Sequence, residues 1–238
     1  MKKKEATRNK KGYYPIDGED FVSVTTFLKV IAKEFLMRWY ASMEKKGVLK
    51  LFSKAKKKGW DSKKLLKRIK AEAEMDNHAA ERYSGKRSDV GNAVHEAIRL
   101  YLDKGKKTKL KSKAARRAFK IFLHWWKKGE YKALKVEQVV SDKKMKVAGT
   151  LDIYLERVKD GARGIGDFKT GKSIYQENHL QLVVYQFLAD KSGFPNDFAV
   201  LIHVPQDGGK VKVHDVNRVK YSLKTAWHAL DLYRGLYE

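Results

Sequence analysis

The sequence contains no cysteine, and this absence excludes several kinds of site at once. Disulfide frameworks, thiolate zinc sites, iron–sulfur clusters and cysteine nucleophiles all need that side chain. The 238 residues include only three prolines, and no Pro- or Ser-rich linker interrupts the chain. No stretch approaches the ~18 consecutive apolar residues that a membrane span requires. The basic start of the chain is not followed by an apolar segment, so we expect no secretion signal.

Acidic residues are scarce relative to basic ones. Lys and Arg number 53 against 28 Asp and Glu, which leaves a formal charge of +25. A surplus of this size predicts a polyanionic partner, because it gives most of the surface a positive potential. Two alternatives remain: a lysine-rich surface that serves solubility or heat stability, and an anionic membrane surface. The lack of cysteine favours an intracellular, cytoplasmic protein, compatible with a viral or prokaryotic source.

Several common catalytic motifs are also missing. The sequence has no Walker-type phosphate loop, no G-x-G-x-x-G fingerprint, no G-x-S-x-G elbow and no H-E-x-x-H pair. The segment GARGIG has glycines spaced as in a phosphate loop, but it continues into an extended run instead of opening a helix. These absences remove the usual nucleotide-binding, serine hydrolase and zinc protease interpretations.

The apolar periodicity predicts an α/β (α+β) protein with an added helical N-terminal part. We expect a basic arm over 1–20, a helical region over 21–86 and a core domain over 87–238. Predicted helices cover 25–45, parts of 48–86 around a loop at 53–64, 88–105, 112–129, 176–190 and 222–238. Predicted strands cover 133–141, 145–158, 162–168, 198–205 and 210–216. Asp61 or Ser62, and Ser88 or Asp89, are expected as N-caps, and Gly105 and Gly129 as helix ends.

Two neighbouring strands carry charged residues at unusual places. Asp152 lies inside an apolar strand, where a carboxylate is rarely buried unless it is paired or bound to metal. The next strand carries Asp167 and Lys169, whose side chains share one face of a sheet. Two carboxylates and one ammonium would suit an oxygen-preferring cation beside a lysine that handles protons. The alternative is a solvated Asp152 and a surface ion pair next to the turn at Gly171.

The helix before these strands carries a histidine on its apolar stripe. His95 recurs with Gly91 and Ile98 at helical spacing, so it points toward whatever the helix packs on. Gly91 leaves room for close approach of another segment, and Glu96 adds a carboxylate next to the imidazole. The imidazole is therefore either a metal ligand or a hydrogen-bonded core residue.

Three further polar residues lie on predicted strands or helices. Glu137 lies in the first strand of the run and is either part of a site or exposed at a sheet edge. Gln181 and Tyr185 are four residues apart, so both lie on one face of the following helix. Their polar ends either meet a phosphate or a catalytic lysine, or form a half-polar helix edge.

In order, these motifs read GNAVHE (91–96), VEQVV (136–140), GTLD (149–152), DFKTG (167–171) and QLVVY (181–185). This order resembles the PD-(D/E)XK nuclease superfamily, in the branch of RecB-like exonucleases, and it implies a restriction-endonuclease-like αβββαβ core. Upstream, SVTTFL and RWYA are similar to the N-terminal region of the mitochondrial genome maintenance exonuclease type. The missing cysteines depart from the iron–sulfur, CRISPR-associated relatives, so we expect no iron–sulfur cluster.

The resemblance implies a role for each matching residue. Divalent metal would be held by His95, Asp152, Asp167 and the backbone carbonyl of Phe168, whose ring we expect to be unimportant. Lys169 would orient or polarise the attacking water.

Other matching residues have supporting roles in the resemblance. Gln181 and Tyr185 would support the lysine and contact the DNA backbone. Glu96 and Glu137 match acids of less certain role: a second metal, support for the ligands or DNA positioning. The expected catalytic set is Lys169, Asp167, Asp152 and Glu137.

Together these features predict a Mg²⁺- or Mn²⁺-dependent DNA nuclease. The resemblance implies an exonuclease that acts on single strands or ends in DNA repair, recombination or replication. The alternatives are a DNA-binding module that keeps the fold without cutting, and a basic scaffold protein with a chance motif match. Trp60, Trp125 and Trp126 are candidates for stacking on unpaired bases or for core packing. DNA is the expected partner, and we expect no membrane partner.

Overall fold

The computed structural model describes residues 6–31, 34–73, 79–216 and 222–238. Internal contacts divide the chain into two compact units, residues 1–31 with 90–238 (unit 1) and residues 32–89 (unit 2). The elements of the chain are β1 (Tyr13–Ile16), β2 (Glu19–Ser23), α1 (Val24–Phe27), the 3₁₀ turn η1 (Leu28–Val30), α2 (Glu34–Lys58), α3 (Ser62–Ala73), α4 (Ala79–Lys104), α5 (Lys113–Trp126), β3 (Tyr131–Asp142), β4 (Val147–Arg157), β5 (Arg163–Lys169), α6 (Gln176–Lys191), β6 (Phe198–His203), β7 (Lys212–Asp215) and α7 (Leu223–Tyr237).

The described strands form one seven-stranded mixed sheet in unit 1. Strands β3, β4 and β5 form an antiparallel meander, and α6 then crosses over so that β6 runs parallel to β5. Strand β7 adds an antiparallel edge, and β2 pairs in parallel with the start of β4. The predicted α/β class and the αβββαβ order are confirmed, since α5, β3, β4, β5, α6 and β6 follow in that order.

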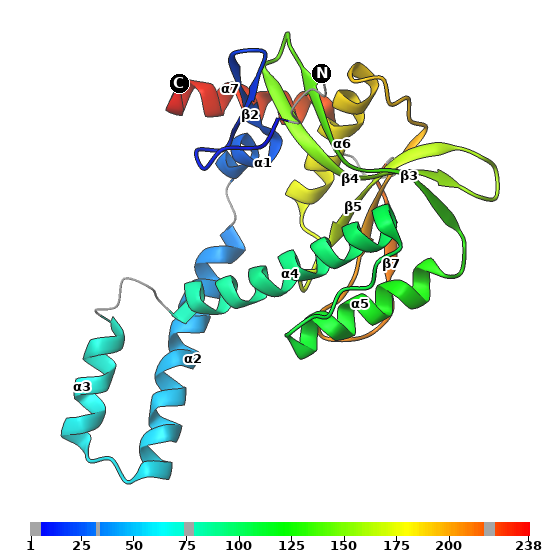
Figure 1. The fold of residues 1–238 in the computed structure, drawn as a ribbon. Helices are drawn as coiled ribbons and strands as arrows, with labels where there is room; N and C mark the ends of the chain where they lie inside the picture. Colours follow the sequence, from blue (N-terminus) through cyan, green and yellow to red (C-terminus); the bar gives the residue numbers. More distant parts are fainter. Residues whose placement is uncertain (1–5, 32–33, 74–78, 217–221) are drawn as a thin grey trace. The chain divides into compact units, whose positions relative to one another are not determined.

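Helices cover both faces of this sheet (Figure 1). One buried cluster joins α1, α6 and α7 to side chains such as Val147, Leu151 and Ile165. A second cluster joins α4 and α5 to Ile153 and Phe168. Because each face of the sheet is buried against helices, the central strands are apolar on both sides. The few charged residues in β4 and β5 therefore stand out against their surroundings.

The N-terminal strands correct the expected basic arm over 1–20 and the helical boundary at 21. Residues 13–23 form a hairpin whose turn places Asp17 and Gly18 at positive φ (51° and 85°). An Asp-Gly pair favours this tight turn, and it brings the flanking apolar residues into register. Tyr14 and Phe21 are 5% and 1% exposed, so burial holds the segment on the sheet.

The predicted helix over 25–45 is also divided differently. The chain forms α1 and η1 first, and α2 begins at Glu34. Side chains 32–41, which include part of the expected apolar stripe, lie outside the described residues. Helix α2 then continues to Lys58, beyond the predicted loop start, and Asp61 caps α3 by accepting the Lys64 amide at 2.7 Å.

Helix α4 is longer than its punctuation predicts. It begins at Ala79, so Ser88 and Asp89 lie within the helix and are not N-caps. Both side chains are exposed, and a polar residue on the outer face of a helix costs little. The end at Gly105 is confirmed, because this residue has a positive φ of 64° and its amide bonds to the Tyr101 carbonyl at 2.9 Å.

Candidate active site

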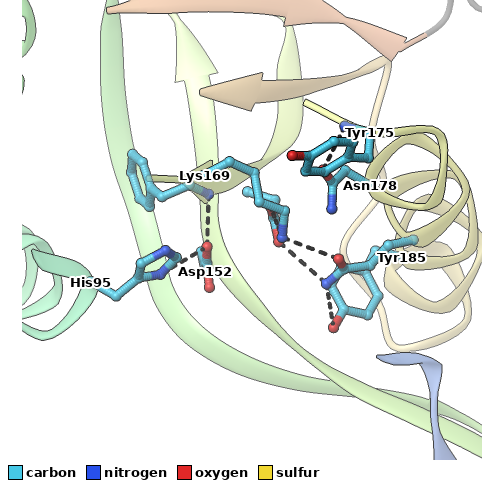
Figure 2. A network of polar contacts seen from close by, with 9 residues as sticks. His95, Asp152, Lys169, Tyr175, Asn178 and Tyr185 are labelled. Carbon is cyan, nitrogen blue, oxygen red and sulfur yellow. Dashed lines mark hydrogen bonds and ion pairs between the residues drawn. The ribbon is translucent and has the colours of Figure 1, made fainter. Parts of the chain in front are cut away.

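The carboxylate of Asp152 lies between α4 and β5. Its Oδ2 accepts the backbone N–H of Phe168 at 2.7 Å and lies 3.5 Å from Nδ1 of His95. The Asp152 side chain is 18% exposed, so neither the fully solvated alternative nor a lysine partner describes it. The amide and the imidazole fix the orientation of this carboxylate (Figure 2). His95 accordingly points from α4 to an acid on β4 with which the resemblance, and not helix periodicity, had grouped it.

Asp167 and Lys169 form a buried ion pair on β5. The Asp167 Oδ2 to Lys169 Nζ distance is 2.6 Å, and the two side chains are 4% and 21% exposed. Burial raises the pKa of Asp167 to about 6, Lys169 opposes this rise and Asp152 adds to it. Burial alone would lower the pKa of Lys169, but Asp167 and Asp152 outweigh it and the pKa is raised. Lys169 therefore stays protonated, and the surface ion pair considered from the sequence is wrong.

Helix α6 extends this pair into a chain of hydrogen bonds. Lys169 Nζ donates to Gln181 Oε1 at 3.1 Å, and Gln181 Nε2 donates to Asp167 Oδ1 at 3.4 Å and to Tyr185 OH at 3.2 Å. In Figure 2, Lys169 lies between Asp152 and Tyr185. Burial raises the pKa of Tyr185, so its hydroxyl stays protonated. The backbone of Gly149 makes room for this ring, because a Cβ there would overlap it. Gln181 thus fixes the Lys169 ammonium.

Glu137 lies on β3, opposite Asp152 on the neighbouring strand β4. Val136 pairs with Ile153 and Gln138 pairs with Leu151, so Glu137 and Asp152 lie opposite each other between these pairs. The backbone of Glu137 has a φ of 53°, which is a strained conformation for a non-glycine residue. Burial raises the pKa of Glu137 to about 7, with Asp152 as the next cause. Glu137 is therefore a third carboxyl close to the acid of β4 and is only partly exposed.

In β4, the alternation of side chains between the two faces of the sheet is interrupted near Asp152. Leu151 and Tyr154 pack in the cluster of α6, whereas Ile153 and Leu155 pack in the cluster of α4 and α5. Strict alternation would place Leu151 with Ile153, and it predicts a shared face for Asp152 and Tyr154. The structure departs from this alternation, since Asp152 contacts His95 on the α4 side.

Glu96 forms an ion pair with Arg99, a residue that the sequence analysis did not identify. Arg99 donates Nε to Glu96 Oε2 at 2.7 Å and Nη2 to Oε1 at 2.6 Å. The Arg99 guanidinium lowers the pKa of Glu96 and opposes the raised pKa of Glu137. The spacing of three residues on one helix was the available signal for this pair. Glu96 is thus held at the edge of the site by a cation, and its side chain is 53% exposed.

Close packing of α4 on the end of β5 depends on Gly91, as its spacing suggested. A Cβ at this position would lie 2.8 Å from Thr170 Oγ1. Thr170 is 7% exposed and accepts a hydrogen bond from Gln206 Nε2 at 3.3 Å. Neither residue was singled out in the sequence, and Gln206 has no motif that could have identified it.

The ring of Phe168 corrects one expectation. It is 2% exposed and packs edge-on against Phe122, with centroids 5.6 Å apart, and against His95 at 6.3 Å. The residue therefore anchors β5 to the α4 and α5 layer in addition to offering backbone groups. Trp125 is likewise part of this core and is 8% exposed.

The donor set suits a hard divalent cation by its chemistry. Glu137, Asp152 and Asp167 supply carboxylate oxygens and His95 supplies an imidazole, the ligand types used by Mg²⁺ and Mn²⁺. A cation here would offset the burial, and the lesser repulsion from Asp152, that raise the pKa of Asp167 and Glu137. Among the described side chains, however, no three His, Asp or Glu lie close enough together to hold a metal ion as they stand. The Lys169 ammonium is the positive charge next to Asp167.

Comparisons with known proteins give little further information. No family model matches the chain, and no curated protein matches it. A solved structure described as "Crystal structure of SSO0001" aligns with 63% of this chain and 75% of its own, at 13% identity and a TM-score of 0.32. Across the described part of the chain, no helix is long and apolar enough to cross a membrane.

Proposed function

We propose that this protein is a divalent-metal-dependent deoxyribonuclease that hydrolyses phosphodiester bonds, acting as an exonuclease on single-stranded DNA or DNA ends. The observation that carries the proposal is the linked group of His95, Asp152, Asp167, Lys169 and Gln181, which comes from four different elements. A protein that only binds DNA has no need for a buried acid pair beside a fixed ammonium.

The residues of this group have separable tasks in phosphodiester hydrolysis. Asp152 and Asp167, with His95 and the Phe168 carbonyl, would hold Mg²⁺ or Mn²⁺. Such an ion supplies Lewis acidity and lowers the pKa of a bound water. Lys169 stays protonated, so it stabilises the negative charge that develops on the phosphate and orients the nucleophile.

Gln181 and the residues around this group have supporting roles. Gln181 fixes the Lys169 ammonium, and Tyr185 fixes the Gln181 amide in turn. Glu137, with its pKa raised to about 7, can exchange a proton near neutral pH beside Asp152. We assign Glu137 to proton transfer or to the support of the metal ligands, and Glu96 to the positioning of DNA.

The charge of the protein agrees with a DNA substrate. A net charge of +25 favours binding of a polyanion without regard to sequence, and such binding weakens steeply with salt. An intracellular nuclease that acts in DNA repair, recombination or replication fits this behaviour and the lack of cysteine.

A second candidate function is a DNA-binding module that keeps the nuclease fold without cleaving. The observation in its favour is the 2.6 Å Lys169–Asp167 ion pair, which already satisfies the charge of one proposed metal ligand. The described side chains include no group of three or more His, Asp or Glu that could hold a metal ion, which also favours this candidate.

Digestion of end-labelled DNA separates the two candidates. Linear single strands, circular single strands and duplexes are incubated with Mg²⁺, Mn²⁺ or EDTA, and the products are resolved by length. The proposal expects metal-dependent loss of linear strands from an end, with circular strands spared. Cleavage of circles would change the assignment to an endonuclease. DNA binding with no cleavage in either metal would favour the second candidate.

A further inference from the structure

A dense group of positive charges outside the candidate site lies on the hairpin of α2 and α3 in unit 2, whose helices run side by side (Figure 1). Between residues 45 and 70 the chain has twelve basic residues and one acid, Asp61. All twelve basic side chains are exposed. Asp61 caps α3, and no ion pair between described side chains involves any of the twelve. The hairpin therefore concentrates positive charge that the described side chains leave uncompensated by ion pairs.

An aromatic ring lies at the turn of this hairpin and collects part of that charge. The Trp60 ring centroid is 5.8 Å from Lys54 Nζ, 5.7 Å from Lys64 Nζ and 5.8 Å from Arg68 Cζ. The Trp60 amide donates to the Ala55 carbonyl at 3.0 Å, which fixes the backbone of the turn. Cations from both helices thus surround one half-buried ring.

Other apolar side chains are exposed on the same helices. Phe52 is 50% exposed on α2, Leu49 is 63% exposed and Leu66 on α3 is 54% exposed. Aromatic rings interleaved with cations are the surface on which unpaired bases stack while the flanking phosphates are neutralised. A duplex hides its base faces, so its phosphates would contact the cations but its bases would not stack on the rings.

We propose that the α2–α3 hairpin is a binding site for single-stranded nucleic acid. Lys54, Lys64 and Arg68 contact phosphates, and Trp60 and Phe52 stack on bases. This site goes beyond the proposed hydrolysis, because binding at the hairpin requires neither metal nor the residues of the candidate active site. Its test is therefore done in EDTA, where failure of the nuclease proposal does not affect the result.

The electrostatic part is tested with the full-length chain and fluorescein-labelled oligo-dT by anisotropy over a series of salt concentrations. One triple variant carries Lys54→Gln, Lys64→Gln and Arg68→Gln. The control triple carries Lys120→Gln, Lys159→Gln and Lys224→Gln, which are exposed lysines of unit 1 with the same change in charge. The hairpin variant should reduce the salt slope of log K by about 2, since each single-strand phosphate contact contributes about 0.7. An equal change in both triples overturns the proposal.

The stacking part is tested with Trp60→Leu. Binding of oligo-dT should weaken about tenfold, and part of the tryptophan quenching on binding should be lost. Circular dichroism of each variant confirms that helix content is kept, and Phe52→Leu provides a second variant on an exposed side chain. Unchanged affinity in both leucine variants overturns the role of the rings. If the hairpin variants lost binding to phosphatidylserine vesicles but kept binding to oligo-dT, the hairpin would be a membrane-binding surface and the proposal would be overturned.

Discussion

The contact between Gly91 and Thr170 allows a quantitative test of how α4 is held on β5. A Cβ at Gly91 would lie 2.8 Å from Thr170 Oγ1 and 3.7 Å from Gln206 Nε2. Thr170 is buried, and its hydroxyl is committed to the hydrogen bond from Gln206. In Gly91→Ala, either this hydrogen bond breaks or the helix moves away from the strand end.

Two opposing free energies decide the outcome of Gly91→Ala. Alanine is better than glycine inside a helix by about 1 kcal/mol. Overpacking of a tight contact costs about 1–3 kcal/mol. The free energy of unfolding should therefore fall by about 0–2 kcal/mol in the single variant. Since Thr170→Ala removes the clashing oxygen, Gly91→Ala in that background should instead stabilise the protein by up to about 1 kcal/mol.

The assay is urea denaturation followed by circular dichroism for the four members of this double-mutant cycle. The coupling energy should be about 1–3 kcal/mol, well above the ~0.5 kcal/mol at which distant sites add. Gly85→Ala is the matched control, because it lies in the same helix with no atom within 4 Å of its added Cβ, and it should be stabilising. A coupling energy near zero would refute the packing argument.

Three further predictions concern stability and pH. Phe168→Ala should lower the free energy of unfolding by about 3–5 kcal/mol, and Phe168→Leu should lower it by much less. Equal losses in the two variants, measured by urea denaturation, would contradict the core role of the ring. Gly149→Ala should destabilise by about 1–3 kcal/mol because its Cβ overlaps the Tyr185 ring, and Tyr185→Leu should relieve this; additive losses would count against it. Burial lowers the pKa of His179 and His214, so the stability that depends on their neutral forms should be complete above pH 6.5 and fall as the pH drops below it. The urea midpoint measured against pH checks this. If the double variant His179→Gln/His214→Gln shows the same pH profile as the wild type, the two histidines are not the cause.

The core of the fold could be predicted because its signals are local. Strands β3 to β7 fall on the predicted apolar runs, and Gly105 and Gly129 follow the ends of their helices at positive φ. The start of α4 could not be predicted this way, since Ser88 prefers an N-cap but costs little on the exposed face of a helix, so its presence does not fix a helix start. The hairpin over 13–23 has a local turn signal at Asp17 and Gly18, but its place on the sheet depends on burial, which a local pattern does not contain.

The candidate site also has residues whose positions a local pattern predicts and residues whose positions it does not. Strand periodicity predicted that Lys169 and Asp167 share one face, and helix periodicity predicted that His95 points toward the packed side of its helix, but only the resemblance brought His95 together with Asp152. The left-handed backbone of Glu137 did not, because the sequence shows a charged residue in a strand and no glycine. The contact between Thr170 and Gln206 becomes visible only in the tertiary structure, whereas Arg99 lies three residues from Glu96 on the same helix and had a local signal. The resemblance to RecB-like exonucleases supplied the roles, and these stay predictions.

The central claim is that Lys169 belongs to a metal-dependent catalytic group. Its most direct test is the single-turnover cleavage rate of 5′-labelled single-stranded DNA in Mg²⁺, comparing Lys169→Met with Lys172→Met, an exposed neighbour. Because Lys169→Met leaves Asp167 buried and unpaired, the double variant Lys169→Met/Asp167→Asn provides a folding control. We predict a rate at least about 100-fold lower for Lys169→Met, near wild-type cleavage for Lys172→Met and none in EDTA. A folded Lys169→Met variant that cleaves at the wild-type rate, or cleavage that persists in EDTA, would contradict the account.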